Sequence, residues 1–278
     1  MIYFVRKYPL AFFSGLFLIL LSLSTLLAPL LVQDPYVQDV GKTLLAPQSN
    51  HLMGMDALGR DLGARILYGA RISLLIGFAS TLLAFLFGTA LGAVSAYVGG
   101  WVDNFLMRGV DLWYSFPALL LIVLIKEIIE QGEPKRGLWA IVIALSIYSW
   151  MHVARIIRGE ILRLREMNFV EAAKGLGIPH FQIIWRHLIP NTWGPLLVTL
   201  TMRIPLAILA ESMLGFVGLG VKSPLASWGT LASEGWTAMR FYPHLIIFPS
   251  LALFTTILAF NFLGETLRDH FDPRLGVA

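Results

Sequence analysis

The chain has 278 residues, of which 57% are hydrophobic and 14% are charged, and its formal net charge is +4. Soluble proteins average about 45–50% apolar and about 25% charged residues, so this composition excludes that class and indicates a polytopic membrane protein. The cations flank apolar segments, which is typical of residues that set membrane topology and not of a nucleic-acid-binding surface. Because the chain has no cysteine, it has neither a disulfide framework nor a thiolate metal site.

Six apolar segments have the roughly 17 or more residues that a transmembrane helix needs. We expect these spans at about residues 9–32, 72–98, 112–129, 138–154, 193–221 and 245–263. The first follows Arg6 and Lys7 and is longer than a signal-peptide core of about 7–15 residues, so we expect it to be retained. The expected fold is therefore all-α, with the first span and a polar loop over residues 1–70 and a five-helix core over residues 71–278.

Local signals refine three of these segments. Gly88 and Gly92 lie four residues apart in the second span, a spacing of small residues that lets helices approach closely in lipid. Pro117 predicts a kink or a helix start in the third span. Residues 64–75, before the second span, are amphipathic enough to form a helix on the membrane surface, and the sequence leaves that possibility open.

The long polar interruption of the chain, residues 168–191, separates the fourth span from the fifth. Two sets of apolar residues recur there at helical spacing: Phe169, Ala172, Ala173 and Leu176, and then Phe181, Ile184, Trp185 and Leu188. This spacing predicts two short amphipathic helices. Their apolar faces lie outside the membrane and the chain has no soluble domain to cover them, so we expect a partner protein to bind there.

Capping signals define the ends of these two helices. Asn168 is expected to cap the first helix, with Glu171 three residues later as its capping-box partner. Gly177 supplies the stop of that helix. Pro179 suits the first turn of the second helix, where a missing N–H costs nothing.

Orientation follows from the distribution of lysine and arginine. Four arginines crowd the end of the fourth span: Arg155, Arg158, Arg163 and Arg165. Such clusters favour the cytoplasmic side of a membrane. With six spans, both termini lie on the same side as residues 168–191, so all three are expected to be cytoplasmic.

The polar stretch also carries a family motif. Glu171-Ala172-Ala173, followed after three residues by Gly177 and later by Ile189-Pro190, resembles the EAA loop of bacterial ABC importer permeases. The sequence departs from that motif at His187, which replaces an apolar residue, and at Ile189, which stands for leucine.

Three further segments are similar to the dipeptide, oligopeptide and nickel branch of that family. They are residues 51–61, residues 211–229 ending in Ser227-Trp228-Gly229, and residues 248–274 ending in Asp272-Pro273-Arg274. In the first of them, Leu52, Met53 and Met55 replace the usual proline, leucine and threonine. The four elements follow the family order and together cover nearly the whole chain.

This resemblance implies a type I ABC importer permease fold in the bacterial inner membrane. It implies three kinds of partner: a homologous second permease, two cytoplasmic ATPase subunits and an extracytoplasmic solute-binding protein. ATP and magnesium would be bound by the ATPase subunits, and the chain itself has no G-x-x-x-x-G-K-[ST] segment and needs no cofactor. The residues expected to couple to the ATPase are Phe169, Glu171, Ala172, Ala173, Gly177, Pro179 and Pro190.

Two charged residues lie inside the predicted fifth span, where charge is expensive and tends to face a partner or a water-filled cavity. Arg203 and Glu211, together with Met213, are candidates for the translocation path. Packing between spans is the alternative for both charges. A carboxylate at Glu211 would suit a peptide amino group or a cation, and Arg203 would neutralise Glu211 or meet a carboxylate. Residues 222–244, with Trp228 and Trp236, are expected to form a loop over the outer mouth or at the membrane interface.

The resemblance favours short peptides as the solute, and nickel or a metal chelate stays open as the alternative. The six histidines show no H-x-x-x-H spacing, so no metal site built by this chain alone is expected. No nucleophile–base arrangement is visible either. A stand-alone channel or a membrane enzyme is the remote alternative, because polar residues do not cluster across several spans.

Overall fold

The computed structural model describes residues 8–133 and 136–271, and over these ranges the regular structure is helical, with two isolated β-bridges. Arg6, Lys7 and the Asp272-Pro273-Arg274 motif lie outside the described residues. The longer helices are α2 (Pro9–Leu26), α4 (Leu62–Val98), α5 (Gly100–Tyr114), α6 (Ala118–Glu130), α7 (Gly137–Leu164), α10 (Trp193–Phe216), α11 (Trp228–Ala238) and α12 (His244–Phe271). Short helices are α3 (Ala28–Leu31), η1 (Val40–Lys42), α8 (Asn168–Gly175) and α9 (His180–Gln182).

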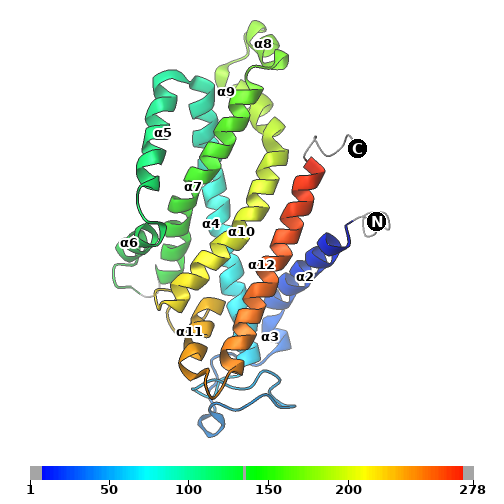
Figure 1. Ribbon diagram of the computed structural model, residues 1–278, viewed down its shortest axis with the longest axis vertical. Coiled ribbons are helices and arrows are strands. Elements are labelled where there is room, and N and C mark those ends of the chain that lie inside the picture. Colours follow the sequence, from blue (N-terminus) through cyan, green and yellow to red (C-terminus); the bar gives the residue numbers. More distant parts are fainter. Residues whose placement is uncertain (1–7, 134–135, 272–278) are drawn as a thin grey trace.

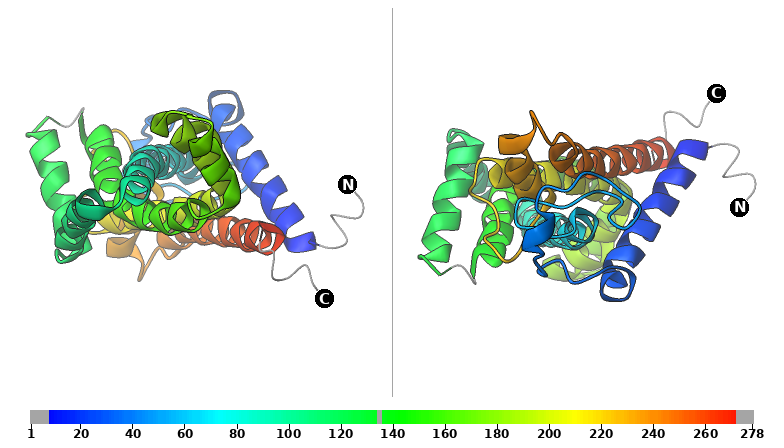
Figure 2. Two further views of the ribbon diagram at one scale, coloured as in Figure 1. Left: turned by 90° about the horizontal axis from the view of Figure 1, so that it is seen from above. Right: turned by 90° about the horizontal axis from the view of Figure 1, so that it is seen from below.

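The long helices form an elongated bundle in which α8 lies at one end and α11 at the other (Figure 1). We call these the α8 end and the α11 end. The start of α2 and the end of α12 both point toward the α8 end, whereas the loop before α4 lies at the α11 end. Viewed along the bundle, α2 lies on one side of the group formed by α4, α7 and α10, and α5 and α6 lie on the opposite side (Figure 2).

Within the described ranges, five helices are long and apolar enough to cross a membrane. The predicted third span is different, because it is broken into α5 and α6, which bend by 96° relative to each other. Pro117 precedes the first residue of α6, as expected for a residue that cannot donate the hydrogen bond of a continuous helix. The predicted kink or helix start at Pro117 is confirmed, and the bent pair counts as the sixth span if both helices are taken together.

Two ion pairs involve the end of α6, and the second joins it to the segment after α10. The Lys126 ammonium lies 2.6 Å from one carboxylate oxygen of Glu130, one turn later on α6. The ammonium of Lys222, in the segment after α10, lies 2.6 Å from the other oxygen. Lys126 and Glu130 are both buried, so each charge depends on its ionic partners to offset the cost of burial.

The start of α4 lies ten residues before the predicted second span. The Asp61 side chain accepts a hydrogen bond from the Ala64 backbone N–H at 2.8 Å and so caps the helix. Residues 64–75 are the first turns of α4 and not a separate helix on the membrane surface. The possibility that the sequence left open is therefore settled in favour of one continuous helix.

The most extensive helix contact in the described part of the bundle is between α4 and α7. A Cβ atom added to Gly92 would lie 2.4 Å from the backbone oxygen of Ala154, and one added to Gly88 would lie 2.6 Å from that of Trp150. Only glycine leaves room for backbone atoms at these distances. The predicted close approach at Gly88 and Gly92 is confirmed, and α7 is the helix that fills the space.

Residues 228–238 correct the prediction of a loop over residues 222–244. They form the helix α11, which begins with a capping box between Ser227 and Thr230. Trp228 is fully buried, and its indole N–H donates to the backbone oxygen of Ile66 at 3.1 Å. Gly229 brings α11 against α10, because a Cβ there would lie 2.4 Å from the backbone oxygen of Ser212. Trp228 is thus a core residue, whereas Trp236 is exposed.

Candidate coupling surface

The surface at the α8 end is built by residues 168–192 (Figure 1). After α8 and α9, the π-helical turn η3 (Ile183–Leu188) and the 3₁₀ turn η4 (Ile189–Thr192) lead directly into α10. The second predicted helix is therefore a sequence of three short helical types that continues into the next span. We call residues 168–188 the coupling surface.

The inner side of the coupling surface is packed on α4 and α7. Its buried side chains are Val170, Ala173, Ile183, Ile184 and Leu188. They share one hydrophobic cluster with Ala93 and Ala96 of α4 and with Ile157 and Ile161 of α7. These contacts join α8 and the turns after it to the ends of two long helices.

Polar contacts fix the same junction. The hydroxyl of Tyr97, in the last turn of α4, lies 2.7 Å from the Nδ1 atom of His180. The guanidinium of Arg165, just after α7, donates to the backbone oxygen of Ala96 at 2.7 Å. The Tyr97–His180 contact thus attaches the coupling surface to α4, and the Arg165 bond fixes the end of α7 to α4 next to it.

The outer side of the coupling surface exposes large apolar side chains. Leu176 is 81% exposed and Phe181 is 69% exposed. Phe169 and Trp185 are also exposed, and the rings of Phe181 and Trp185 lie 5.9 Å apart. A cluster of apolar side chains of this kind outside a membrane indicates a protein-binding surface.

The predicted apolar faces are therefore divided between two directions. Of the first predicted set, Ala173 points into the bundle, while Phe169, Ala172 and Leu176 are exposed. Of the second set, Ile184 and Leu188 are buried and Phe181 and Trp185 are exposed. The sequence assigned each whole apolar face to a partner protein, and this is corrected for Ala173, Ile184 and Leu188, which pack within this chain. Val170, one residue after Phe169, adds to the inward contact of α8.

Glu171 lies in the first turn of α8, and its side chain is exposed. The predicted capping box with Asn168 is wrong, because α8 begins at Asn168 and its N-cap, Met167, offers no side-chain acceptor. Within residues 8–133 and 136–271, the Glu171 carboxylate makes no hydrogen bond and no ion pair. Helix capping therefore does not explain why a glutamate occupies position 171.

The turn after α8 requires Gly177. Its φ is +71°, a left-handed conformation that costs other residues about 1–2 kcal/mol. The Gly177 N–H donates to the Lys174 oxygen at 3.0 Å, and the Ile178 N–H donates to the Ala173 oxygen at 3.1 Å, which closes the end of the helix. The predicted stop at Gly177 is confirmed. Pro179 lies one residue before α9, at its N-cap, and not in its first turn as predicted.

Replacing Gly177 by alanine should loosen this turn without a steric clash, because no atom lies within 4 Å of an added Cβ. We expect the backbone strain of about 1 kcal/mol to raise amide hydrogen exchange in residues 168–188 by about fivefold. Gly175→Ala is the matched control, since Gly175 also has open space but no left-handed φ. Equal exchange in the two variants would contradict the role assigned to the Gly177 turn.

The three candidate path residues occupy different surroundings on α10. Glu211 is fully buried and accepts a hydrogen bond from the Ser73 hydroxyl of α4 at 3.1 Å. Met213 is exposed on the opposite side of α10, and Arg203 is half-buried near α5 and α7. The described residues contain no ion pair between Arg203 and Glu211. All three stay predictions for the path.

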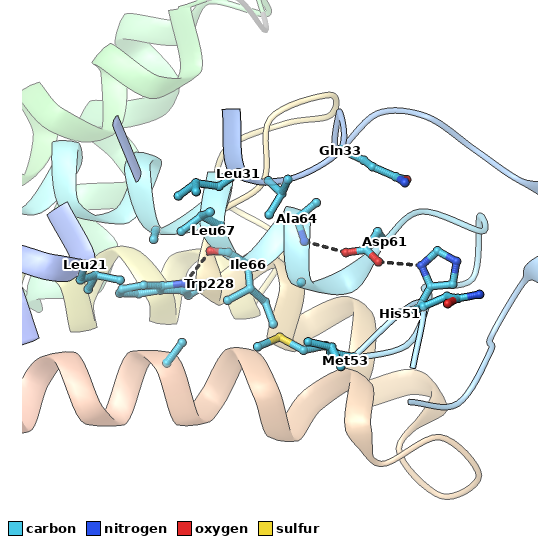
Figure 3. Close-up of a pocket in the computed structure, with 16 residues that line it drawn as sticks. Leu21, Leu31, Gln33, His51, Met53, Asp61, Ala64, Ile66, Leu67 and Trp228 are labelled. Atoms are coloured by element: carbon cyan, nitrogen blue, oxygen red, sulfur yellow. Dashed lines mark hydrogen bonds and ion pairs between the residues drawn. The ribbon is translucent and has the colours of Figure 1, made fainter. Parts of the chain in front are cut away.

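The motif at residues 51–61 was identified by its resemblance to a family segment alone. In the structure it lies at the α11 end. Its Asp61 binds the Nδ1 atom of His51 at 2.9 Å beside a pocket of about 510 Å³, shown in Figure 3. Its Asp56 accepts from Arg60 at 2.6 Å and from Arg65 at 2.7 Å. Arg65 also pairs with Glu234 of α11, so the motif joins the loop, α4 and α11.

No group of His, Asp or Glu side chains in the described ranges has the geometry to hold a metal ion.

Over residues 88–277 the chain matches the family described as the binding-protein-dependent transport system inner membrane component. The match spans more than half of the chain, so the chain belongs to this family. It is a membrane permease subunit of a binding-protein-dependent transport system.

Three relatives cover nearly the whole chain. The oligopeptide transport system permease protein OppC of Bacillus subtilis is 38% identical over 97% of this chain and 87% of its own length. The dipeptide transport system permease protein DppC of the same organism is 38% identical over 98% of this chain and 84% of its own length. The glutathione transport system permease protein GsiD of Pectobacterium atrosepticum is 38% identical over 98% of this chain and 89% of its own length.

Solved structures share the fold. The MetNI methionine ABC transporter in its inward-facing conformation matches with a TM-score of 0.62 at 16% identity, over 74% of this chain and 96% of that chain. An amino acid ABC transporter with histidines matches with a TM-score of 0.56 at 19% identity, over 75% of this chain and 94% of that chain. The expected all-α, type I ABC importer permease fold is confirmed.

Proposed function

We propose that the chain is the permease subunit of an ATP-driven importer for short peptides. The observation that carries this proposal is the identity of 38% to permeases named for oligopeptides, dipeptides and glutathione, over 97–98% of this chain. The three solutes differ in size and side chains but share a peptide backbone with charged ends. A peptide is therefore the solute class common to the relatives.

In this proposal two ATPase subunits drive the transporter, and one of them docks on the coupling surface. Three features support this docking. Leu176, Phe181 and Trp185 offer exposed apolar anchors of the kind that dominate protein interfaces. Glu171 adds a carboxylate with no partner among the described residues. ATP and Mg²⁺ would be bound by the ATPase subunits, and this chain would carry no chemistry of its own.

The α8 end would face the cytoplasm, with both chain termini on the same side. The arginines at the end of α7 support this orientation, since they lie beside the coupling surface and favour the cytoplasmic side. The α11 end would then face outward, where a solute-binding protein delivers the peptide. A homologous second permease would complete the pore against this chain.

Transport would proceed by alternating access. Closure of the ATPase dimer would move the coupling surface, and the shared core of Val170, Ile183 and Leu188 with α4 and α7 would carry the motion into the membrane. The close contact of α4 with α7 at Gly92 would make these two helices move together.

The test is uptake by the purified complex, isolated through a tag on this chain and reconstituted into vesicles with its binding protein. We expect ATP-dependent accumulation of radiolabelled alanyl-alanine and no accumulation of radioactive nickel(II). Accumulation of nickel without the peptide would favour the metal alternative and contradict the proposal. Peptide uptake that is independent of ATP would indicate a channel and would contradict it as well.

A further inference from the structure

The helix α5 has few buried attachments to the rest of the bundle. Of its 15 residues, only Asp103 and Val110 are buried. Trp101, in its first turn, is 78% exposed. The backbone link from α4 to α5 is made by Gly99 and Gly100, whose φ values of +68° and +55° both favour glycine. Asp103 is therefore the only buried side chain in the first two turns of α5.

The Asp103 carboxylate joins three helices. Its Oδ1 atom accepts a hydrogen bond from the Ser95 hydroxyl of α4 at 2.6 Å and one from the Nε atom of Arg158 of α7 at 2.6 Å. Its Oδ2 atom accepts from a terminal nitrogen of Arg158 at 2.5 Å. Two parallel bonds from a guanidinium fix the orientation of a carboxylate as well as its distance. We call Ser95, Asp103 and Arg158 the Asp103 junction.

A second ion pair between α5 and α7 differs from this junction in burial. Asp111 and Arg155 form that pair, and their side chains are 60% and 45% exposed, whereas the side chain of Asp103 is 13% exposed. Exposed ion pairs contribute little, whereas loss of one partner of a buried pair leaves a charge that water reaches poorly. The two pairs therefore differ in the strength with which they hold α5 to α7.

The Asp103 junction lies beside the residues that hold the coupling surface. Ala96 of α4 follows the junction's serine in the chain, and Ile157 of α7 precedes its arginine. Both side chains belong to the hydrophobic cluster that contains Val170 and Leu188 of the coupling surface. The helix α5 starts near this end of the bundle and leads to α6 (Figure 1). It is thus joined to the same ends of α4 and α7 that carry the coupling surface.

We propose that Asp103 and Arg158 are positioning residues for transport, because their ion pair makes α5 follow the coupling surface when the transporter changes state. The proposal rests on the proposed function and extends the coupling to the broken span. Alternating access requires parts of the chain to move as units. The motion also reaches α6, because only residues 115–117 separate it from α5. Without the ion pair, the link at Gly99 and Gly100 lets α5 lag behind.

The first test measures uptake of radiolabelled alanyl-alanine per ATP hydrolysed by the complete complex in vesicles. We expect about a tenfold lower ratio in Asp103→Asn and in Arg158→Gln, the effect typical of a hydrogen bond between charged groups. The double variant should lose no more than either single variant, because both substitutions remove the same contact. A smaller amount of folded complex lowers uptake and hydrolysis equally and leaves this ratio unchanged.

Asp111→Asn is the matched control, since it removes the exposed ion pair between the same two helices and should keep the wild-type ratio. A wild-type ratio in Asp103→Asn would overturn the proposal. Losses that multiply in the double variant would overturn it as well, because the two residues would then act separately.

The second test measures the position of α5 directly. Spin labels are attached to Asn104→Cys on α5 and Gly175→Cys on the coupling surface, two exposed positions of a chain without cysteine, in a complex with cysteine-free partner subunits. We expect the same distance between the labels with and without a non-hydrolysable ATP analogue. When Asp103→Asn is added, we expect the distance to change with the analogue.

A distance that changes when Asp103 is present, or one that stays constant in Asp103→Asn, would overturn the proposal. The first of these outcomes needs no substitution in the junction, so it stands even if Asp103→Asn does not fold. If the wild-type complex takes up no peptide, the proposed function fails, whereas the label distances test the junction separately.

Discussion

Replacing Glu171 by lysine should abolish coupling, so that solute uptake and stimulated ATP hydrolysis both fall more than about tenfold. The reversed charge would meet the surface that receives the carboxylate, and a like-charge contact of this kind costs several kcal/mol, while about 1.4 kcal/mol already gives tenfold. The permease should still fold and reach the membrane, because Glu171 is exposed and makes no contact among the described residues that the change would break. Uptake, ATP hydrolysis and the membrane level of the chain measure these effects.

Two further variants make this prediction specific. Glu171→Gln keeps the shape of the side chain and removes its charge, so we expect an intermediate loss of about tenfold, typical of one hydrogen bond to a charged group. Glu265→Lys reverses an exposed acid on α12, outside the coupling surface, and should leave uptake unchanged. If Glu171→Lys transported at the wild-type rate, the assignment of the ATPase contact to Glu171 would be wrong.

Replacing Gly92 by alanine should strongly destabilise the bundle. The added Cβ would lie 2.4 Å from the backbone oxygen of Ala154 and 3.0 Å from its Cα, and backbone atoms of α7 cannot move aside individually. Forcing extra atoms into a packed interior costs about 1–3 kcal/mol. We expect a lower unfolding temperature of the purified chain in detergent and a lower amount in the membrane.

Gly109→Ala is the matched control for this packing prediction. Gly109 lies inside α5, and no atom lies within 4 Å of an added Cβ. Alanine in a helix interior is more favourable than glycine by about 0.5–1 kcal/mol, so this variant should unfold at the same or a higher temperature. Equal destabilisation by the two substitutions would show that helix contact is not what excludes a side chain at Gly92.

Periodicity and local motifs predicted most of the coupling surface. The helical spacing around Ala173 and Ile184 located the two short helices, and Gly177 marked the turn, because both signals are local. The inward contact of Val170 and the start of α8 at Asn168 were not predictable, since they depend on packing against α4 and α7. The same packing explains why the predicted apolar faces divided.

Ion pairs between residues far apart in the chain could not be predicted from the sequence either. Arg65 pairs with Glu234 across 169 residues of chain, and Lys222, after α10, pairs with Glu130 at the end of α6. Spacing within one segment contains no information on such pairs. The helix α11 was not predicted for a related reason, because its Ser and Gly residues are typical of a loop. In the structure, the missing side chain of Gly229 allows α11 to contact α10.

The central claim is that the coupling surface contacts an ATPase subunit. Because the chain contains no cysteine, Leu176→Cys creates a single thiol on the exposed outer side of this surface, and Leu52→Cys creates one at the α11 end. A photoactivatable benzophenone maleimide attached to each thiol forms adducts with whatever protein lies beside it. These adducts are identified by mass spectrometry in the intact complex.

We predict that Leu176→Cys yields an adduct with an ATPase subunit and that Leu52→Cys yields none. An intact complex in which the label at position 176 reaches no ATPase, or in which both labels reach it equally, would contradict the account.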